Sequence, residues 1–380
     1  IASGRVQVAR DPFLPKIFAG SGAAYTSGFP MSIEGSAPAI VQARAVASVY
    51  DRRQRLQLEA ARENVRGAGL DTERRRDRVV RETIEAWLEA YWTARSLDLA
   101  TRQTGSLEKA RDVVRLRVEA GRDTPIELRR AELEVARARQ RAEAVEGALA
   151  YAEETLAMII GLPAGDRARA AEEEPAAIEL PAGEEAAVAA ALESSREVRR
   201  LESALAAKGL EAESHRSARW PRLSLVAQYG LFSRFNNYDE FFQRFQRHNG
   251  QIGVALEVPV WIGAAPAAQA SQAESEAQRL RTEIAAARQR ISLETRQAFR
   301  EVRRAATGRD VARLDLDVAR ESLSVVLALM DEGRATLRQL EEARAHEQSK
   351  WIAYYDAQHA FDRARYSLLD NTGALLASLR

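Results

Sequence analysis

Two stretches of the chain, residues 52–120 and 264–332, repeat apolar residues at the spacing of an α-helix. In the first stretch Ile84, Leu88 and Tyr91 fall on one helical face, and both stretches are rich in the helix formers Ala, Arg, Glu and Leu. A helix of about 68 residues is roughly 100 Å long, and it needs lateral partners along its whole length. These stretches alone predict long helices in coiled-coil packing.

Four shorter segments alternate apolar and polar residues with a period of two: 15–25, 39–50, 221–232 and 251–261. In the last of them Ile252, Val254 and Leu256 share one face, whereas the residues between them are small or polar. The segments have about the length of a tilted transmembrane strand, but a half-buried hairpin in a soluble domain alternates in the same way. Both interpretations stay open on this pattern. A helical membrane protein is excluded, because no apolar run approaches the roughly 18 residues of a spanning helix.

An internal repeat links the two halves of the chain. Residues 118–128 match residues 330–340, and Gly121 and Gly333 stand at corresponding positions 212 residues apart. Other landmarks keep nearly the same offset. Each repeat is therefore expected to contain two strands, a very long helix, a tight turn and a shorter helix that returns antiparallel to the long one.

These boundaries predict the following organisation. The first repeat covers residues 1–162, with strands 15–25 and 39–50, long helix 52–120, hairpin tip 121–124 and return helix 125–161. Residues 163–183 form an equatorial linker. The second repeat covers residues 184–380, with half-helix 184–219, strands 221–232 and 251–261, long helix 264–332, hairpin tip 333–336 and return helix 337–380. Because the first repeat lacks a counterpart of the half-helix, we expect the natural chain to begin before Ile1.

The two hairpin tips carry the signals of a helix end followed by a helix start. Each glycine suits the left-handed position just past a helix. Thr124 is a good N-cap for the returning helix, and Glu127 is placed to complete a capping box with it. Thr336 and Gln339 take the same positions in the second tip. Both tips are thus predicted to be tight helical hairpins.

Composition narrows the possible functions. The chain of 380 residues has a net charge of +1 from 56 basic and 55 acidic residues, which argues against an electrostatic nucleic-acid binder. There is no Cys, so disulfides, thiolate metal sites and Cys nucleophiles are excluded. The four His residues show no metal-ligand spacing. No catalytic, cofactor-binding or metal-binding residue is therefore predicted, and the chain is not expected to be an enzyme.

Three motifs, taken with the paired hairpins, resemble a known family. They are P-x-L-x-L at 221–225, E-V-P-V-W-x-G at 257–263 and I-I-G-L-P at 159–163. Their order and spacing resemble the TolC-like outer membrane efflux proteins, or outer membrane factors, over essentially the whole chain. The resemblance implies a mainly α fold with a small β part. Long helical hairpins of three chains would form an α-barrel, joined to a transmembrane β-barrel to which each chain gives four strands.

The resemblance also implies a function and a location. The family forms passive exit ducts of tripartite efflux or type I secretion systems, which carry small molecules or polypeptides. The expected partners are two further copies of the chain, a periplasmic membrane-fusion adaptor, an inner-membrane pump of RND or ABC type, and outer-membrane lipid. No nucleic acid and no cofactor are expected. The duct would lie in the outer membrane of a Gram-negative type cell, with its helices in the periplasm. The alternatives are a soluble coiled-coil scaffold and a periplasmic adaptor without channel activity.

The resemblance places the periplasmic gate and adaptor-docking site at the hairpin tips. The candidate residues are Gly121, Arg122, Thr124, Glu127, Arg130, Gly333, Arg334, Thr336, Gln339 and Glu342. Polar and acidic residues at the start of the return helices close the mouth in this family, and the register assigns that role here to Glu127, Arg130, Gln339 and Glu342. Better-known members have Asp at the last two of these positions.

Some partners of the family gate are replaced in this chain. Met330 and Ala335 stand where the family has aromatic and basic gate residues, and Arg122 and Arg334 are candidate substitutes. The simpler interpretation of Glu127 and Arg130 is an ordinary i,i+3 surface pair. The aromatic loop at 232–245 resembles an extracellular loop or an interfacial girdle, and packing at the tip of a hairpin explains it equally well.

Overall fold

The computed structural model describes residues 2–21, 39–163, 165–171, 179–232, 246 and 248–378. Nearly all of the aromatic loop at 232–245 lies outside these residues. The chain divides into two compact units. The strand unit consists of Ile1–Thr72 and Arg196–Ala287, and the hairpin unit consists of Glu73–Ser195 and Arg288–Arg380.

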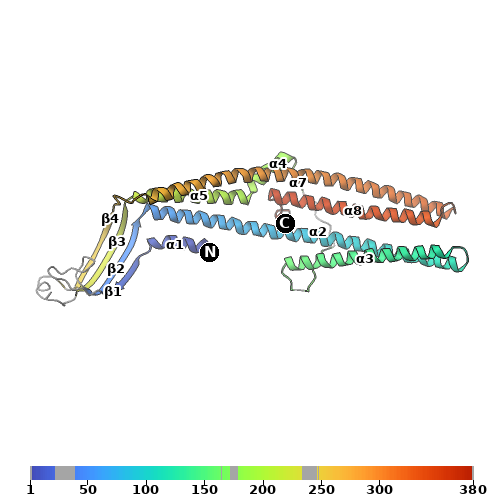
Figure 1. Ribbon diagram of the computed structural model, residues 1–380, viewed down its shortest axis with the longest axis horizontal. Helices are drawn as coiled ribbons and strands as arrows, with labels where there is room; N and C mark the ends of the chain where they lie inside the picture. The colour runs from blue at the N-terminus through green and yellow to red at the C-terminus, as the bar shows by residue number, and fades with distance from the viewer. Residues whose placement is uncertain are drawn as a thin grey trace. The chain divides into compact units, whose positions relative to one another are not determined.

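The strand unit contains one antiparallel sheet in the order β1-β2-β3-β4 (Figure 1). Its strands are β1 (Lys16–Gly20), β2 (Ala39–Tyr50), β3 (Arg222–Phe232) and β4 (His248–Glu257). A strand therefore lies in each of the four alternating segments. Strand β4 ends before Pro259, which has no N–H to donate to a neighbouring strand.

The register of the sheet separates two faces of opposite character. Ile17, Ala45, Ala227 and Ile252 lie opposite one another on the apolar face. Phe18, Arg44, Gln228 and Gln251 form a neighbouring row on the other face, which is mostly polar. The sequence alternation is thus the alternation of two sides of one sheet.

The helices of the strand unit include two elements that the sequence analysis did not predict. Helix α1 (Ala2–Arg10) and the short 3₁₀ helix η1 (Asp11–Phe13) precede β1, in the region where the analysis expected no helix. Helix α1 buries none of its residues, and its sequence has no strong apolar stripe from which a helix could be predicted. Helix α5 (Arg196–Arg216) and the 3₁₀ helix η2 (Ser217–Arg219) lead into β3.

The long helices α2 (Arg52–Glu119) and α7 (Ala265–Asp331) contribute residues to both units. Within the strand unit α2 packs against α5. The Arg66 Nε donates a hydrogen bond of 3.0 Å to the Ser203 Oγ, and a Cβ at Gly67 would lie 3.8 Å from the Ser203 Cβ. Lys208 Nζ lies 2.7 Å from a carboxylate oxygen of Glu276 and so ties α5 to α7.

The predicted half-helix 184–219 is broken, which corrects the sequence analysis. Helix α4 (Glu184–Ser194) ends at Ser195, whose φ of −58° and ψ of 108° leave the helical region. Two serines in succession favour such a break, because their hydroxyls compete for backbone hydrogen bonds; the Ser194 Oγ donates to the Ala191 carbonyl at 3.4 Å.

In the hairpin unit, α3 (Pro125–Ile159) and α8 (Leu337–Thr372) return from the two tips. Helix α8 stops short of the predicted end at 380, because Gly373 takes a left-handed conformation with φ of 71°. Gly161 ends α3 in the same conformation, with φ of 82°. The offset between these glycines is that of the internal repeat.

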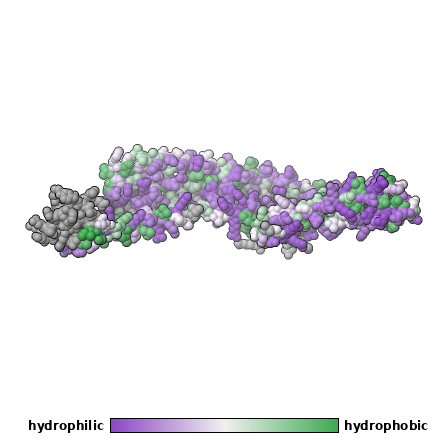
Figure 2. Space-filling view, turned by 60° about the horizontal axis from the view of Figure 1, so that its bottom comes forward, coloured by the Kyte–Doolittle hydropathy of each residue, from purple (hydrophilic) through white to green (hydrophobic). Residues whose placement is uncertain are grey.

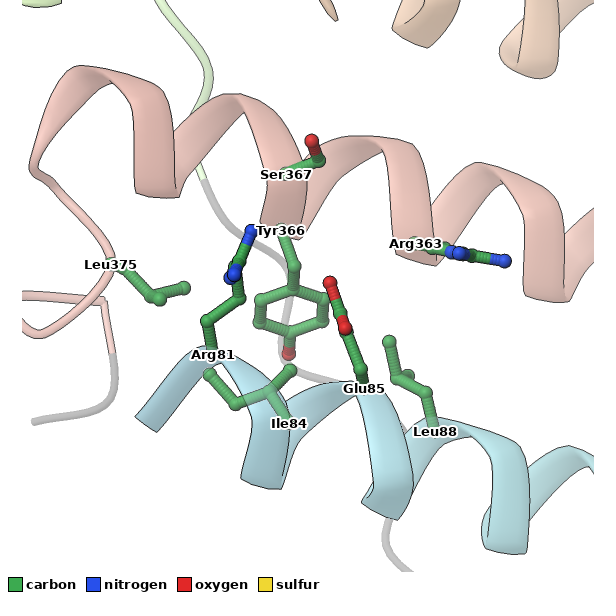
Figure 3. A pocket seen from close by; sticks show the side chains of 8 residues that line it. All are labelled: Arg81, Ile84, Glu85, Leu88, Arg363, Tyr366, Ser367 and Leu375. Carbon is green, nitrogen blue, oxygen red and sulfur yellow. The ribbon is translucent and has the colours of Figure 1, made fainter. Parts of the chain in front are cut away.

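The core of the hairpin unit lies where α2 and α8 meet. Ile84 and Leu88 of α2 pack with Tyr366 and Leu369 of α8 and with Leu375, which follows α8. Figure 3 shows the side chains of four of these five residues converging. The space left between them is about 10 Å³, no larger than one water molecule. This region is therefore packed core and not a ligand site.

A polar group is enclosed in the same contact between α2 and α8. The Asp362 side chain is 2% exposed; it accepts a hydrogen bond of 3.2 Å from the Trp92 Nε1, and Arg365 lies 3.3 Å from it. Burial raises the pKa of Asp362, and the neighbouring Arg365 and Trp92 act against that shift.

No helix in the described part of the chain is long and apolar enough to span a membrane.

Candidate functional site: the hairpin tips

The two tips have the same backbone geometry. In the first, the N–H groups of Gly121 and Arg122 donate to the carbonyls of Val118 and Arg117 at 2.9 and 2.8 Å. In the second, the corresponding bonds from Gly333 and Arg334 to Met330 and Leu329 have the same lengths. Gly121 has φ of 70° and Gly333 has φ of 73°. Both are therefore Schellman-type ends, as the glycine positions predict.

The returning helices begin at the predicted residues, but only one has the predicted capping box. Thr336 accepts from the Gln339 N–H at 3.3 Å, and the Gln339 side chain accepts from the Thr336 N–H at 2.8 Å. Thr124 is also an N-cap with extended backbone, yet its side chain makes no capping hydrogen bond. The prediction of a box there is wrong, because the Glu127 carboxylate instead accepts a hydrogen bond from Arg130 at 2.8 Å.

The charged side chains at the tips form local pairs. Glu127 and Arg130 are 48% and 65% exposed, and Glu342 pairs with Arg338 at 2.9 Å in an equally open position. Arg334 lies 3.2 Å from Glu332, and Arg122 is exposed. Open i,i+3 and i,i+4 pairs of this kind are worth a few tenths of a kcal/mol. A single chain thus displays these charges toward solvent at its tips.

Charges also meet between the two hairpins of the same chain. Burial raises the pKa of Glu341, and the negative charges of Glu127 and Glu134 on α3 raise it further. The pKa of Arg338 is raised first by its hydrogen bond to Glu342 and more weakly by Glu127. The charges at the start of α3 therefore act on ionisable groups at the start of α8. Hydrophilic side chains cover most of the visible face at the tips (Figure 2, right).

Three further residues of this region were not predicted from the sequence. Asp123 accepts from the Arg117 Nε at 2.7 Å and so closes the first turn. The charges of α3 influence the pKa values of Arg338 and Glu341 on α8. The repeat places Ala335 where Asp123 stands, so comparison of the two tips gave no signal for Asp123. The other two depend on which helices become neighbours, which the local pattern does not encode.

The sheet provides a second surface of functional interest. Its polar face is concave and borders a volume of about 1150 Å³. Lys16, Gln42, Arg44, Gln228 and Gln251 are among the lining residues. The opposite face is apolar and no described residues cover it, so that Ile17 is 75% exposed and Ile252 is 80% exposed.

Comparison with known proteins finds a family match over the first part of the chain. The family model of the outer membrane efflux proteins matches residues 2–162. Over that segment the chain is similar to the outer membrane efflux protein family. The resemblance seen in the sequence motifs is thereby confirmed, and the family is one of channel proteins and not of enzymes. No functionally curated protein matches the chain.

Solved structures of outer membrane channels share the fold over nearly the whole chain. CusC superposes with a TM-score of 0.77 at 16% identity, covering 98% of this chain and 86% of that one. The CmeC outer membrane channel of Campylobacter jejuni gives 0.76 at 12% identity, covering 98% of this chain and 80% of CmeC. The open state of the Neisseria gonorrhoeae MtrE outer membrane channel gives 0.75 at 17% identity, covering 99% and 84%. The predicted mainly α fold with a small β part is confirmed, and neither the scaffold nor the adaptor alternative is supported.

Proposed function

We propose that the chain is one of three subunits of a passive exit duct in the outer membrane of a Gram-negative type cell. An inner-membrane pump of RND or ABC type supplies the energy, and a periplasmic membrane-fusion adaptor docks on the hairpin tips. The duct itself carries out no chemical step. The family match to outer membrane efflux proteins supports this proposal, and the single observation that carries it is the two-faced sheet.

The apolar face of the sheet needs an apolar surrounding. Val254 and Leu256 of β4 are 64% and 65% exposed on this face, in addition to Ile17 and Ile252. Exposed apolar area costs about 25 cal/mol per Å², and soluble proteins rarely leave such a continuous patch uncovered. Lipid covers the patch if the strands cross the membrane. Val260 and Trp261, which follow β4 and are 96% and 89% exposed, then lie at the membrane surface.

The polar face needs water, and the edges of the sheet need partners. Within the described residues, strands β1 and β4 each pair on one side only, so the sheet ends in two open edges. Four strands are too few to enclose a channel. If the β4 edge of one subunit pairs with the β1 edge of the next, three chains close a barrel whose polar faces line a water-filled lumen.

The tips supply the inner gate in this proposal. Three chains bring six hairpin tips together around the mouth, and Glu127, Arg130, Gln339 and Glu342 then face neighbouring chains. Charges that are exposed in one chain become partly desolvated there, which strengthens their pairing. Arg122, Arg334 and Arg338 add positive charge around this mouth. Glu341 adds a carboxylate that is already half-buried in the single chain.

Conductance in planar bilayers tests both the duct and its gate. Purified wild-type protein is expected to insert as a channel of low open probability. The double variant Glu127→Gln, Glu342→Ala is expected to open more often, because it weakens contacts between chains while Thr336 still caps α8. The matched control is Glu301→Gln, which removes another exposed i,i+3 pair, with Arg304 on α7, away from the tips.

The outcomes separate the two parts of the proposal. If correctly folded wild-type protein forms no channel in the bilayer, the proposal that the chain forms a duct is overturned. A duct whose open probability is the same in wild type and the double variant shows that these carboxylates do not hold the gate. Equal gains in the double variant and the Glu301→Gln control assign the effect to general loss of surface charge.

A further inference from the structure

One basic residue stands out on the concave face of the sheet. Arg44 lies in the middle of β2, with Phe18 of β1 and Gln228 of β3 as its register partners. Gln251 of β4 continues the same row. Arg44 is exposed, and it borders the open volume on the polar side. The row therefore presents one formal charge among neutral side chains.

Among the described residues that border this volume, the two other basic residues lie next to carboxylates, and one further carboxylate is buried. Lys16 Nζ lies 3.0 Å from a carboxylate oxygen of Asp11. Arg222 is the direct cross-strand partner of Glu257, a position in which opposite charges attract. The buried Asp51 accepts the Gln54 N–H at 3.1 Å at the start of α2, where the helix dipole favours a negative charge. Within the described residues, Arg44 has no carboxylate partner.

We propose that Arg44 of three subunits forms a cationic ring in the membrane segment of the duct, which makes this segment selective for anions. The preferred cargo is then a small solute that carries a carboxylate, sulfonate or phosphate group. This inference rests on the proposed function, because only the assembled duct places three copies around one lumen. Rings of Arg or Lys are a general means of favouring anions in pores.

The size of the effect follows from the distance and the salt. A ring around a lumen wide enough for export lies on the order of one Debye length from the axis, about 10 Å at 0.1 M salt. Three unit charges at that distance change the permeability of each ion by about twofold in opposite directions, so the ratio of anion to cation permeability changes by about four- to fivefold. At 1 M salt the Debye length falls to about 3 Å, so the preference should nearly disappear.

Reversal potentials across a potassium chloride gradient test the proposal, since K⁺ and Cl⁻ have similar mobilities in water. The measurement uses open events of the full-length protein in neutral-lipid bilayers at ~0.1 M and ~1 M mean salt. The ratio of Cl⁻ to K⁺ permeability is expected to fall by about four- to fivefold in Arg44→Gln and further in Arg44→Glu. Arg44→Lys should retain the wild-type ratio.

The control removes a balanced pair from the same face. The double variant Arg222→Gln, Glu257→Gln leaves the net charge of the lumen unchanged and should keep the wild-type ratio. The proposal is overturned if Arg44→Gln and Arg44→Glu conduct with the wild-type ratio at ~0.1 M salt. That result would leave the duct itself intact, whereas a failure to form channels would overturn the proposed function instead.

Discussion

Two glycines at equivalent positions of the repeat allow one contact between helices to be measured by itself. Gly373 ends α8 with φ of 71°, and Gly161 ends α3 with φ of 82°. A Cβ at Gly373 would lie 2.6 Å from the Ser194 Cβ at the end of α4, whereas a Cβ at Gly161 would meet nothing within 4 Å. The two sites therefore share the backbone requirement and differ in the space available.

The expected costs follow from this difference. Gly161→Ala places an L-residue in the left-handed region, which costs roughly 1–2 kcal/mol. Gly373→Ala carries the same cost and in addition forces α4 away from α8, which adds about 1–3 kcal/mol as in other overpacked sites. Gly373→Ala should thus lower the free energy of unfolding by about 2–5 kcal/mol in total.

Hydrogen exchange gives the assay its local resolution. Amides of 184–194 should exchange faster in Gly373→Ala than in wild type, and should be unchanged in Gly161→Ala. Chemical unfolding followed by circular dichroism in detergent supplies the global comparison. Adding Ser194→Gly to Gly373→Ala should restore part of the loss, because it removes the atoms that clash. The reasoning is refuted if both Gly→Ala variants lose the same stability and leave α4 equally protected.

Three further predictions concern the caps, one histidine and the assembly. Thr336→Ala should lower the free energy of unfolding by about 1 kcal/mol. Thr124→Ala should lower it less, because of the two threonines only Thr336 makes capping hydrogen bonds. Equal losses measured by chemical denaturation would contradict this. Burial lowers the pKa of His359, although Glu89 acts against the shift. The neutral His359 side chain therefore contributes its full stability above the unfolded pKa of about 6.5. This contribution is lost as the pH falls through the folded pKa. Melting temperatures between pH 8 and pH 5 should therefore fall more for wild type than for His359→Gln. Light scattering in detergent should give the mass of a trimer, and a monodisperse monomer would contradict the assembly proposed above.

Much of the fold is encoded in local pattern, and the sequence shows why. The strands follow from alternation such as Ile252, Val254 and Leu256, and the long helices follow from helical spacing and composition. The tips were predictable because a glycine and a threonine at fixed spacing recur after 212 residues. The failures have equally local causes. The Glu127 side chain binds Arg130 and not the backbone at Thr124. The helix break at Ser195 lies within a segment whose residue pattern is otherwise helical.

The candidate site was only partly predictable. The residues of the turns were found from the repeat, but Arg338 and Glu341 were not, because the charges that act on them come from another helix, α3. Arg44 was missed for a different reason. A lone charge in a strand has meaning only after the register shows which charged residues on the same face are already balanced, as Arg222 is by Glu257.

The two-faced sheet also has a consequence for biogenesis. All five residues of β1 are exposed, and nine of the ten residues of β4 are exposed. A sheet without a buried face gains little stability in water, whereas the hairpin unit has a packed core of its own. The helices should therefore mature first in the aqueous compartment, and the strands should acquire their final order when sister chains and lipid arrive together. On this view, membrane insertion is the last folding step.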